Sequence, residues 1–185
     1  MAGQEHSDEG ASPRELLLEA CRRNNLELLQ EVIQTVTKAN PNTDDHISTL
    51  LNDAVDAIGN HCLHLAATHG SFEVLDMLLD QEGLEVDPLD RMEGDTPLHK
   101  AVRFVNTLSK AEWKAGQAGI ELLIDAGADP RVRNKARLKP FDLVDPANTH
   151  LRTELQKAEF TITAGDDVID EDADEGPTGS ASDSD

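Results

Sequence analysis

The chain has 185 residues, with 37 acidic and 16 basic side chains, so its formal net charge is −21. A surface this acidic repels nucleic acid and anionic membranes, which argues against direct binding to either. No run of about 18 apolar residues predicts a membrane-spanning helix, and no charged-then-apolar leader opens the sequence. Cys21 and Cys62 both fall in predicted helices, so we expect reduced, buried thiols in a protein of the cytoplasm, the nucleus or both.

Residues 1–11 are polar and are predicted to be disordered. The fold is expected to begin at Ser12-Pro13-Arg14-Glu15, where a capping Ser, a Pro at the first helical position and a Glu at the third form a capping box. The sequence then predicts a helix from Leu16 to Arg23 and a second helix from Leu26 to Gln34. Asn24-Asn25 supplies the turn between them, because Asn tolerates the left-handed conformation.

Residues 35–54 interrupt the pattern. Asn40 to Asp45 is rich in turn residues, and His46 to Val55 has the apolar spacing of a short extra helix. We interpret this segment as a surface insertion; a specificity element at the edge of a binding surface is the alternative.

Two octets further along share one pattern. Gly94-Asp95-Thr96-Pro97-Leu98-His99-Lys100-Ala101 follows Gly59-Asn60-His61-Cys62-Leu63-His64-Leu65-Ala66 after 35 residues. The Gly permits a turn with positive φ, Thr96 caps a helix that Pro97 begins, the Leu enters the core, and the His can use both ring nitrogens to join neighbouring units. The residues of this signature are Gly59, Leu63, His64, Gly94, Thr96, Pro97, Leu98 and His99.

This G-x-T-P-L-H-x-A pattern, at a period near 33 residues, resembles the ankyrin repeat. Gly119 to Pro130 is similar to the closing part of such a repeat, with Gly127 as helix C-cap, and Lys139 to Val144 resembles a terminal repeat. The resemblance implies an all-α solenoid over residues 12–162, in which each unit has two helices and a β-turn finger. Its four repeats are expected at residues 12–34, 55–87, 90–130 and 134–160, with insertions at 35–54 and 107–118.

The third repeat has a long connection before its outer helix. Ser109 to Glu112 matches a capping box, so a single helix is predicted from about Lys110 to Asp125, despite Gly116 and Gly119. Trp113 lies on this extension. It either packs against neighbouring helices or stands exposed as a binding anchor.

Residues 163–185 combine many acidic residues with Gly, Pro and Ser, and are predicted to be a disordered tail. The tail either keeps the protein soluble, binds a client, or folds back onto a basic finger. That finger carries Arg131, Arg133, Lys135, Arg137 and Lys139 at every second position, which in an extended hairpin would place all five cations on one face.

The sequence offers little for catalysis. His61, Cys62, His64 and His69 lie close together but lack the spacing of a zinc site, and neither a phosphate-binding loop nor a nucleophile elbow occurs. We therefore expect no catalytic residues, no metal and no cofactor, and predict that the protein is not an enzyme.

The resemblance implies instead that a protein partner binds in a concave groove formed by fingers and inner helices. By position, the expected contact residues are Ile58, Thr68, His69, Arg91, Met92, Arg103, Phe104, Lys135 and Arg137. One hypothesis is a monomeric escort or chaperone of a basic client, such as a ribosomal protein or histone, since small ankyrin proteins with acidic C-termini serve ribosomal proteins. The alternative is a regulatory adaptor or inhibitor of an enzyme or transcription factor.

Overall fold

A computed structural model of the chain describes residues 10–39 and 45–166. These residues form helices and loops without a strand, apart from an isolated antiparallel bridge between Val55 and His61. The helices, in chain order, are α1 (Pro13–Arg23), α2 (Leu26–Ala39), α3 (Asp45–Asp53), α4 (Cys62–His69), α5 (Phe72–Leu79), α6 (Pro97–Thr107), α7 (Trp113–Gly116), α8 (Ala118–Asp125), α9 (Pro140–Leu143) and α10 (Thr149–Asp166).

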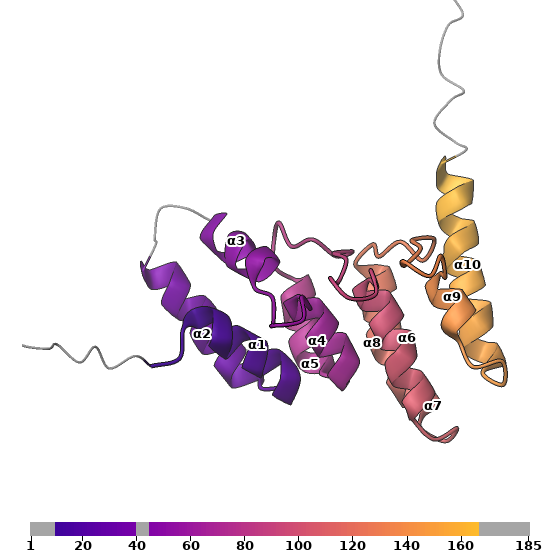
Figure 1. The fold of residues 1–185 in the computed structure, drawn as a ribbon, viewed down its shortest axis with the longest axis horizontal. Helices are drawn as coiled ribbons and strands as arrows, with labels where there is room; N and C mark the ends of the chain where they lie inside the picture. Colours follow the sequence, from indigo (N-terminus) through magenta and orange to yellow (C-terminus); the bar gives the residue numbers. More distant parts are fainter. Residues whose placement is uncertain (1–9, 40–44, 167–185) are drawn as a thin grey trace, which may run out of the picture.

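The helices pair and stack in one row, as the predicted all-α solenoid requires (Figure 1). The inner helices are α1, α4, α6 and α9, and α4 packs between α1 and α6. The outer helices are α2, α5, α8 and α10. None of the helices in the described residues is long and apolar enough to cross a membrane.

Local sequence signals set where the helices begin and end. The hydroxyl of Ser12 accepts a hydrogen bond from the Glu15 amide, while the Glu15 carboxylate accepts one from the Ser12 amide, so the predicted capping box is confirmed. Asn24 ends α1 with φ of 51°, in the left-handed conformation expected for it. Thr96 caps α6, with Pro97 as its first residue.

The core lies between the helix pairs. Leu63 and Leu98, the equivalent leucines of the two octets, are both fully buried, as predicted. Cys21 and Cys62 are also buried and carry free thiols. The neighbouring Cys62 thiol, together with burial, raises the pKa of Cys21, so its reactive thiolate form is suppressed.

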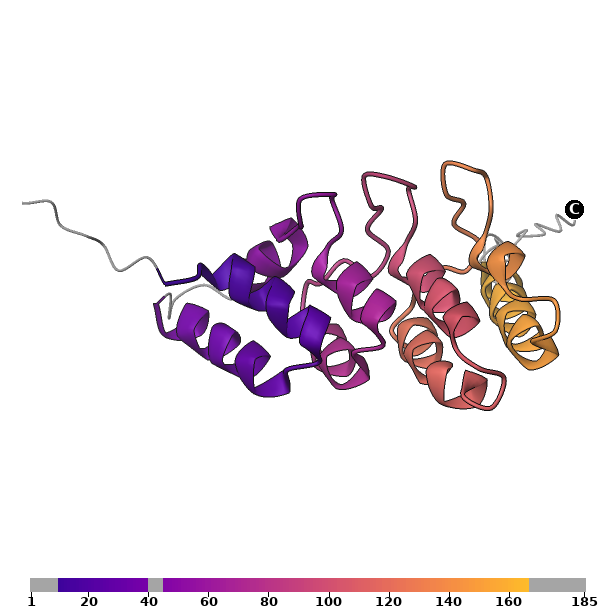
Figure 2. The same ribbon diagram turned by 60° about the horizontal axis from the view of Figure 1, so that its bottom comes forward.

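Three loops project side by side from the same side of the stack (Figure 2). We call them the first finger (residues 54–61), the second finger (residues 88–96) and the third finger (residues 130–139). A backbone hydrogen bond spans each finger, from the Asp56 amide to the Asn60 carbonyl at 3.0 Å, from the Asp90 amide to the Asp95 carbonyl at 2.9 Å and from the Asn134 amide to the Leu138 carbonyl at 3.0 Å. The side chain of the first residue in each closure also accepts two amide hydrogen bonds within its finger.

The structure corrects the prediction of one outer helix from Lys110 to Asp125. Helix α7 begins only at Trp113, and Gln117 separates it from α8. The Glu112 carboxylate accepts hydrogen bonds from the amide and the hydroxyl of Ser109, but the Glu112 amide bonds the Ser109 carbonyl oxygen, so these contacts close a turn before the helix and the capping box is incomplete. Gly116 and Gly119 lie so close to Leu108 and Phe72 that a Cβ atom at either would overlap those side chains. Close packing against Leu108, just after α6, and against Phe72 of the outer helix α5 therefore determines the path of this segment.

Other helices differ from prediction in length rather than in kind. Helix α2 continues to Ala39, α10 continues to Asp166, and α3 confirms the extra helix of the insertion and packs against α2. Trp113 is partly buried against the core, which favours the packing interpretation. The predicted disordered tail begins too early, because residues 163–166 continue α10. The predicted disorder of residues 1–9 and of the tail from 167 onward lies outside the described residues.

Candidate functional site

A groove of about 450 Å³ lies between the first and second fingers, against α6. Its apolar wall comes from Ile58 on the first finger, Met92 on the second and Phe104 on α6. Ile58 and Met92 are 54% and 65% exposed, so these side chains are available to a partner. Phe104 packs edge-on against Phe72, with ring centroids 6.0 Å apart, which fixes the floor of the groove.

The structure brings together some of the residues expected by position and separates others. Five of the nine line this groove, namely Ile58, Thr68, Met92, Arg103 and Phe104. His69 and Arg91 are exposed outside its lining, and Lys135 and Arg137 belong to the third finger. The other lining residues, which are not among these nine, are Asn60, Glu93, Lys100 and Thr107.

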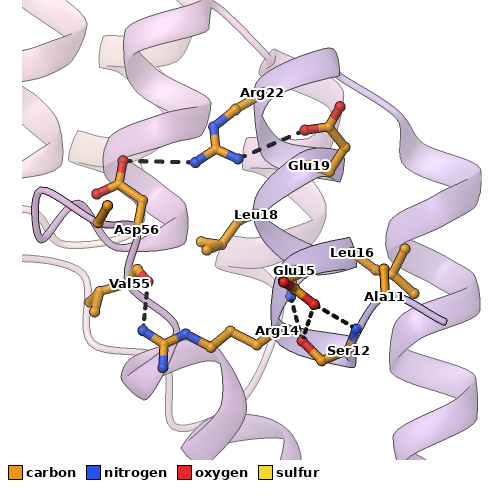
Figure 3. A pocket seen from close by; sticks show the side chains of 11 residues that line it. Ala11, Ser12, Arg14, Glu15, Leu16, Leu18, Glu19, Arg22, Val55 and Asp56 are labelled. Atoms are coloured by element: carbon orange, nitrogen blue, oxygen red, sulfur yellow. Dashed lines mark hydrogen bonds and ion pairs between the residues drawn. The ribbon is translucent and has the colours of Figure 1, made fainter. Parts of the chain in front are cut away.

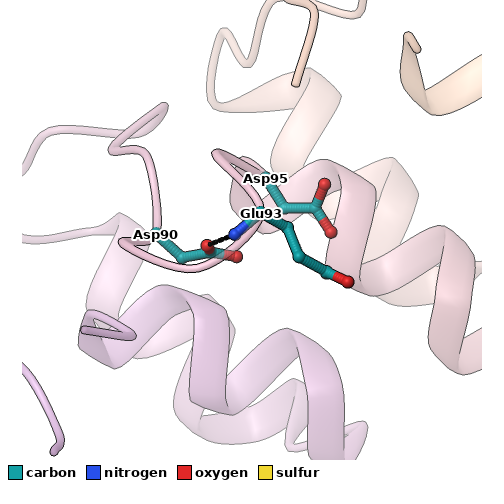
Figure 4. A group of neighbouring side chains, drawn as sticks. All are labelled: Asp90, Glu93 and Asp95. Carbon is teal, nitrogen blue, oxygen red and sulfur yellow. Dashed lines mark hydrogen bonds between the residues drawn. The ribbon is translucent and has the colours of Figure 1, made fainter. Parts of the chain in front are cut away.

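Lys100 centres a charge cluster beside the groove. Its ammonium lies 2.8 Å from Asp90, 3.0 Å from Glu93 and 3.3 Å from Asp95. One carboxylate oxygen from each of Asp90, Glu93 and Asp95 lies within 4.8 Å of the others. Figure 4 shows the three side chains on the second finger. Three carboxylates this close often hold a metal ion, but here the Lys100 ammonium supplies the positive charge between them. The arrangement is an internal ion-pair network.

Asp95 is the buried member of this cluster. It accepts hydrogen bonds from Asn134 at 2.8 Å and from the Arg103 guanidinium at 2.8 Å. Burial opposes its ionisation, yet these donors and the Lys100 charge lower the pKa of Asp95 to about 2. Since the carboxylates outnumber Lys100 and Arg103 by three to two, this edge of the groove is net negative.

Two histidines join successive fingers, in the role predicted for them. The Nε2 atom of His64 lies 2.8 Å from the carbonyl oxygen of Asp95, and that of His99 lies 3.0 Å from the carbonyl oxygen of Leu138. Each Nδ1 accepts an amide hydrogen bond at the start of its own helix. Because a carbonyl only accepts, Nε2 carries the proton and both rings are neutral donors and acceptors at once.

A family model of ankyrin repeats in three copies matches residues 17–134. The chain belongs to the ankyrin-repeat family. It is 44% identical over 177 residues to the ankyrin repeat-containing protein YGL242C of Saccharomyces cerevisiae, which covers 92% of this chain and 93% of the yeast protein. It is also 28% identical over 102 residues to the I-Kappa-B like protein C2 of Microplitis demolitor bracovirus, covering 54% of this chain and 51% of the viral protein.

Ankyrin repeats are protein-interaction modules. In this ankyrin protein, the third finger differs from the structure predicted for it. Its five cations do not form one free face. Arg131 pairs with Asp129 at 3.0 Å, and Lys139 pairs with Glu159 of α10 at 2.7 Å. The Lys135 ammonium donates to the carbonyl oxygens of Arg91 and Met92 on the second finger. The finger bends at its tip instead of extending, so the period-two pattern does not hold.

A second hollow, of about 750 Å³, lies on the other side of the first finger, against α1 of the first ankyrin repeat (Figure 3). Arg14 donates to the Val55 carbonyl at 2.6 Å, and Arg22 lies 3.8 Å from both Glu19 and Asp56. The first repeat has no signature histidine to bond the next finger. Arg14 takes this role by bonding the first finger.

Proposed function

We propose that this ankyrin protein is a non-catalytic escort that holds an exposed segment of a basic protein client in the groove between its first and second fingers. The observation that carries the proposal is the composition of this groove. Its wall is apolar, and its two cations, Lys100 and Arg103, are both held by carboxylates. A segment with an apolar side chain flanked by Lys or Arg is the complementary partner.

Exposed apolar side chains support the fingers as the contact surface. The described part of the chain exposes five large hydrophobic side chains. Four of them lie on fingers: Ile58, Leu89, Met92 and Leu138. Protein interfaces have apolar centres with polar rims, so a finger row of this kind is a suitable centre.

Charge supports a basic client. Residues 39–90 contain eleven acidic residues and no Lys or Arg. Six of these carboxylates are exposed on α3, on α5 and in the loop that leads to the second finger: Asp53, Glu73, Asp76, Asp80, Glu82 and Glu85. Such a field attracts cationic partners and speeds their association. Ribosomal proteins and histones have this chemistry, and the cytoplasm and nucleus are the compartments we propose.

Affinity capture with matched variants tests the proposal. Wild type, Ile58→Ser/Met92→Ser and Phe160→Ser would each be used as bait in native lysate, at low and high salt. Phe160 is 73% exposed on α10, so its variant removes a comparable apolar side chain away from the groove. We expect a basic protein to bind wild type and Phe160→Ser, to be lost from the groove variant, and to weaken with salt. Equal capture by all three proteins would exclude the groove as the binding site.

The second candidate is a regulatory adaptor or inhibitor. The viral relative is named an I-Kappa-B like protein, and this candidate rests on that name and on the apolar groove. Its partner would be a folded protein held by apolar contact. Capture of a neutral or acidic protein by wild type at both salts, and its loss from the groove variant, would favour this function over the escort.

A further inference from the structure

An open apolar groove separates the last two outer helices. It has a volume of about 450 Å³ and is lined by Ile124 of α8, Ala128 after it, and Ala158 and Ile162 of α10. It is open because α10 packs mainly on α9, whereas α8 packs on α5, α6 and α7. Arg131, at the base of the third finger, lines the same groove.

The chain leaves the described structure beside this groove. Helix α10 ends at Asp166, and the next large apolar residues in the sequence are Val168 and Ile169. Four helical residues from Ile162 to Asp166 rise by about 6 Å. Three extended residues from Asp166 to Ile169 span about 10 Å. If the chain reverses direction after α10, Val168 and Ile169 can therefore lie beside Ile162. Gly165 lies in the last turn of α10, and glycine favours such a reversal of the chain.

The third finger offers charge complementary to the acidic residues after Ile169. Arg133, Lys135 and Arg137 are exposed, and the side chains of Arg133 and Lys135 donate hydrogen bonds to main-chain carbonyl oxygens. In contrast, Arg131 and Lys139 pair with carboxylates. The sequence after Ile169 places five acidic residues within six positions: Asp170, Glu171, Asp172, Asp174 and Glu175. Arg131, which lines the groove, and Arg137 belong to the same finger, so an acidic run that begins beside the groove lies next to this finger.

We propose that residues 167–175 fold back onto the body of the protein, with Val168 and Ile169 in the groove between α8 and α10 and the acidic run on the third finger. The tail then covers the third finger and leaves the groove between the first and second fingers open. This inference is independent of the proposed client, because the two surfaces share no lining residue.

Paramagnetic relaxation in the full-length chain tests the fold-back. Cys21 and Cys62 are fully buried, so a nitroxide can be attached selectively to Ala173→Cys. We expect the amide signals of Ala128, Ala136 and Ile162 to lose intensity relative to the reduced label, while those of Lys114 on α7 remain unchanged. Uniform intensities would overturn the proposal, and so would losses confined to Ile58 and Met92, which would place the tail in the other groove.

Two matched variants separate the apolar and charged parts. Val168→Ser/Ile169→Ser should restore the signal of Ile162. Arg133→Glu/Arg137→Glu should restore that of Ala136, whereas Lys110→Glu/Lys114→Glu makes the same charge change at the opposite end of the helices and should leave the losses intact (Figure 1). Retention of every loss in the first two variants would show that neither contact holds the tail and would overturn the proposal.

Discussion

His64 and Asp95, 31 positions apart, are joined by a 2.8 Å contact between the ring Nε2 and the main-chain carbonyl oxygen. The His64 ring is fully buried. Through Nδ1 it also accepts the His61 amide, so one side chain fixes the start of α4 and the end of the second finger. The groove lies between the first and second fingers, and its width therefore depends on a neutral histidine in the core.

This histidine should make stability depend on pH. Burial is the main cause that lowers the pKa of His64 from 6.5 to about 4. Between these values the unfolded chain binds a proton that the folded chain does not, so stability falls as pH falls. The contribution is complete above pH 6.5 and declines by about 3 kcal/mol on the way to pH 4. Urea unfolding measured across this range checks the slope.

His64→Gln provides the comparison. It should be less stable than wild type at pH 7, yet lose less stability between pH 6.5 and 4, because Gln does not titrate. The lowered pKa of Asp95 acts in a different window, since its contribution is present above its unfolded pKa of 3.8 and is lost as pH falls toward about 2. An identical slope in His64→Gln and wild type would show that another group controls this range.

The sequence predicted the features that depend on local signals. The capping box of α1, the left-handed Asn24, both signature histidines and the two core leucines all occupy their expected places. We did not predict from the sequence that Asp56, Asp90 and Asn134 close the three fingers. Asp or Asn recurs at these equivalent positions, and this recurrence could have predicted the turns. Side chains of this kind bond to amides two to four residues on, as they do here.

Packing between repeats could not be predicted from the sequence. Lys100 occupies an unassigned position of the signature octet, and its three carboxylate partners converge only through the shape of the second finger. The third finger bends because two of its side chains bind the second finger: Lys135 donates to the Arg91 carbonyl oxygen, and Asn134 donates to the Asp95 carboxylate. Alternating charge in a sequence carries no information about such contacts.

The core leucines should tolerate truncation poorly. Leu63→Ala and Leu98→Ala each remove a fully buried side chain between inner helices, so each should lower the free energy of unfolding by roughly 2–5 kcal/mol. Chemical unfolding of both variants checks this. Leu89→Ala is the control, since Leu89 is 53% exposed and should cost little. Wild-type melting of both core variants would contradict the repeat assignment.

The charge cluster should be sensitive at Asp95 and tolerant at Glu93. Asp95→Asn removes the charge from a side chain that is fully buried and paired with Arg103 and Lys100, and should cost about 2 kcal/mol. Glu93→Gln removes a charge from the same cluster, but Glu93 is 49% exposed and should cost about 0.5 kcal/mol or less. Calorimetric melting of both variants measures the loss of stability. Equal losses would mean that burial does not determine how much each carboxylate contributes to stability.

Gly70 should be coupled to the floor of the groove. It ends α4 with φ of +64°, and a Cβ atom there would overlap the ring of Phe104. Gly70→Ala should therefore cost roughly 2–4 kcal/mol, of which about 1–2 kcal/mol is left-handed backbone strain and the remainder displacement of the ring. In a Phe104→Leu background the ring is absent, so the same substitution should show only the backbone part.

A double-mutant cycle measures this coupling from urea unfolding of wild type, both single variants and the double variant. Gly127→Ala serves as the control glycine, because it also has positive φ but nothing lies within 4 Å of its Cβ position. Its cost should be the same in wild type and in the Phe104→Leu background, since no contact links the two sites. If the losses of unfolding free energy in Gly70→Ala and Phe104→Leu are additive, the Phe104 ring moves aside without cost. The groove floor would then be adjustable, and a partner could reshape it on binding instead of meeting a fixed surface.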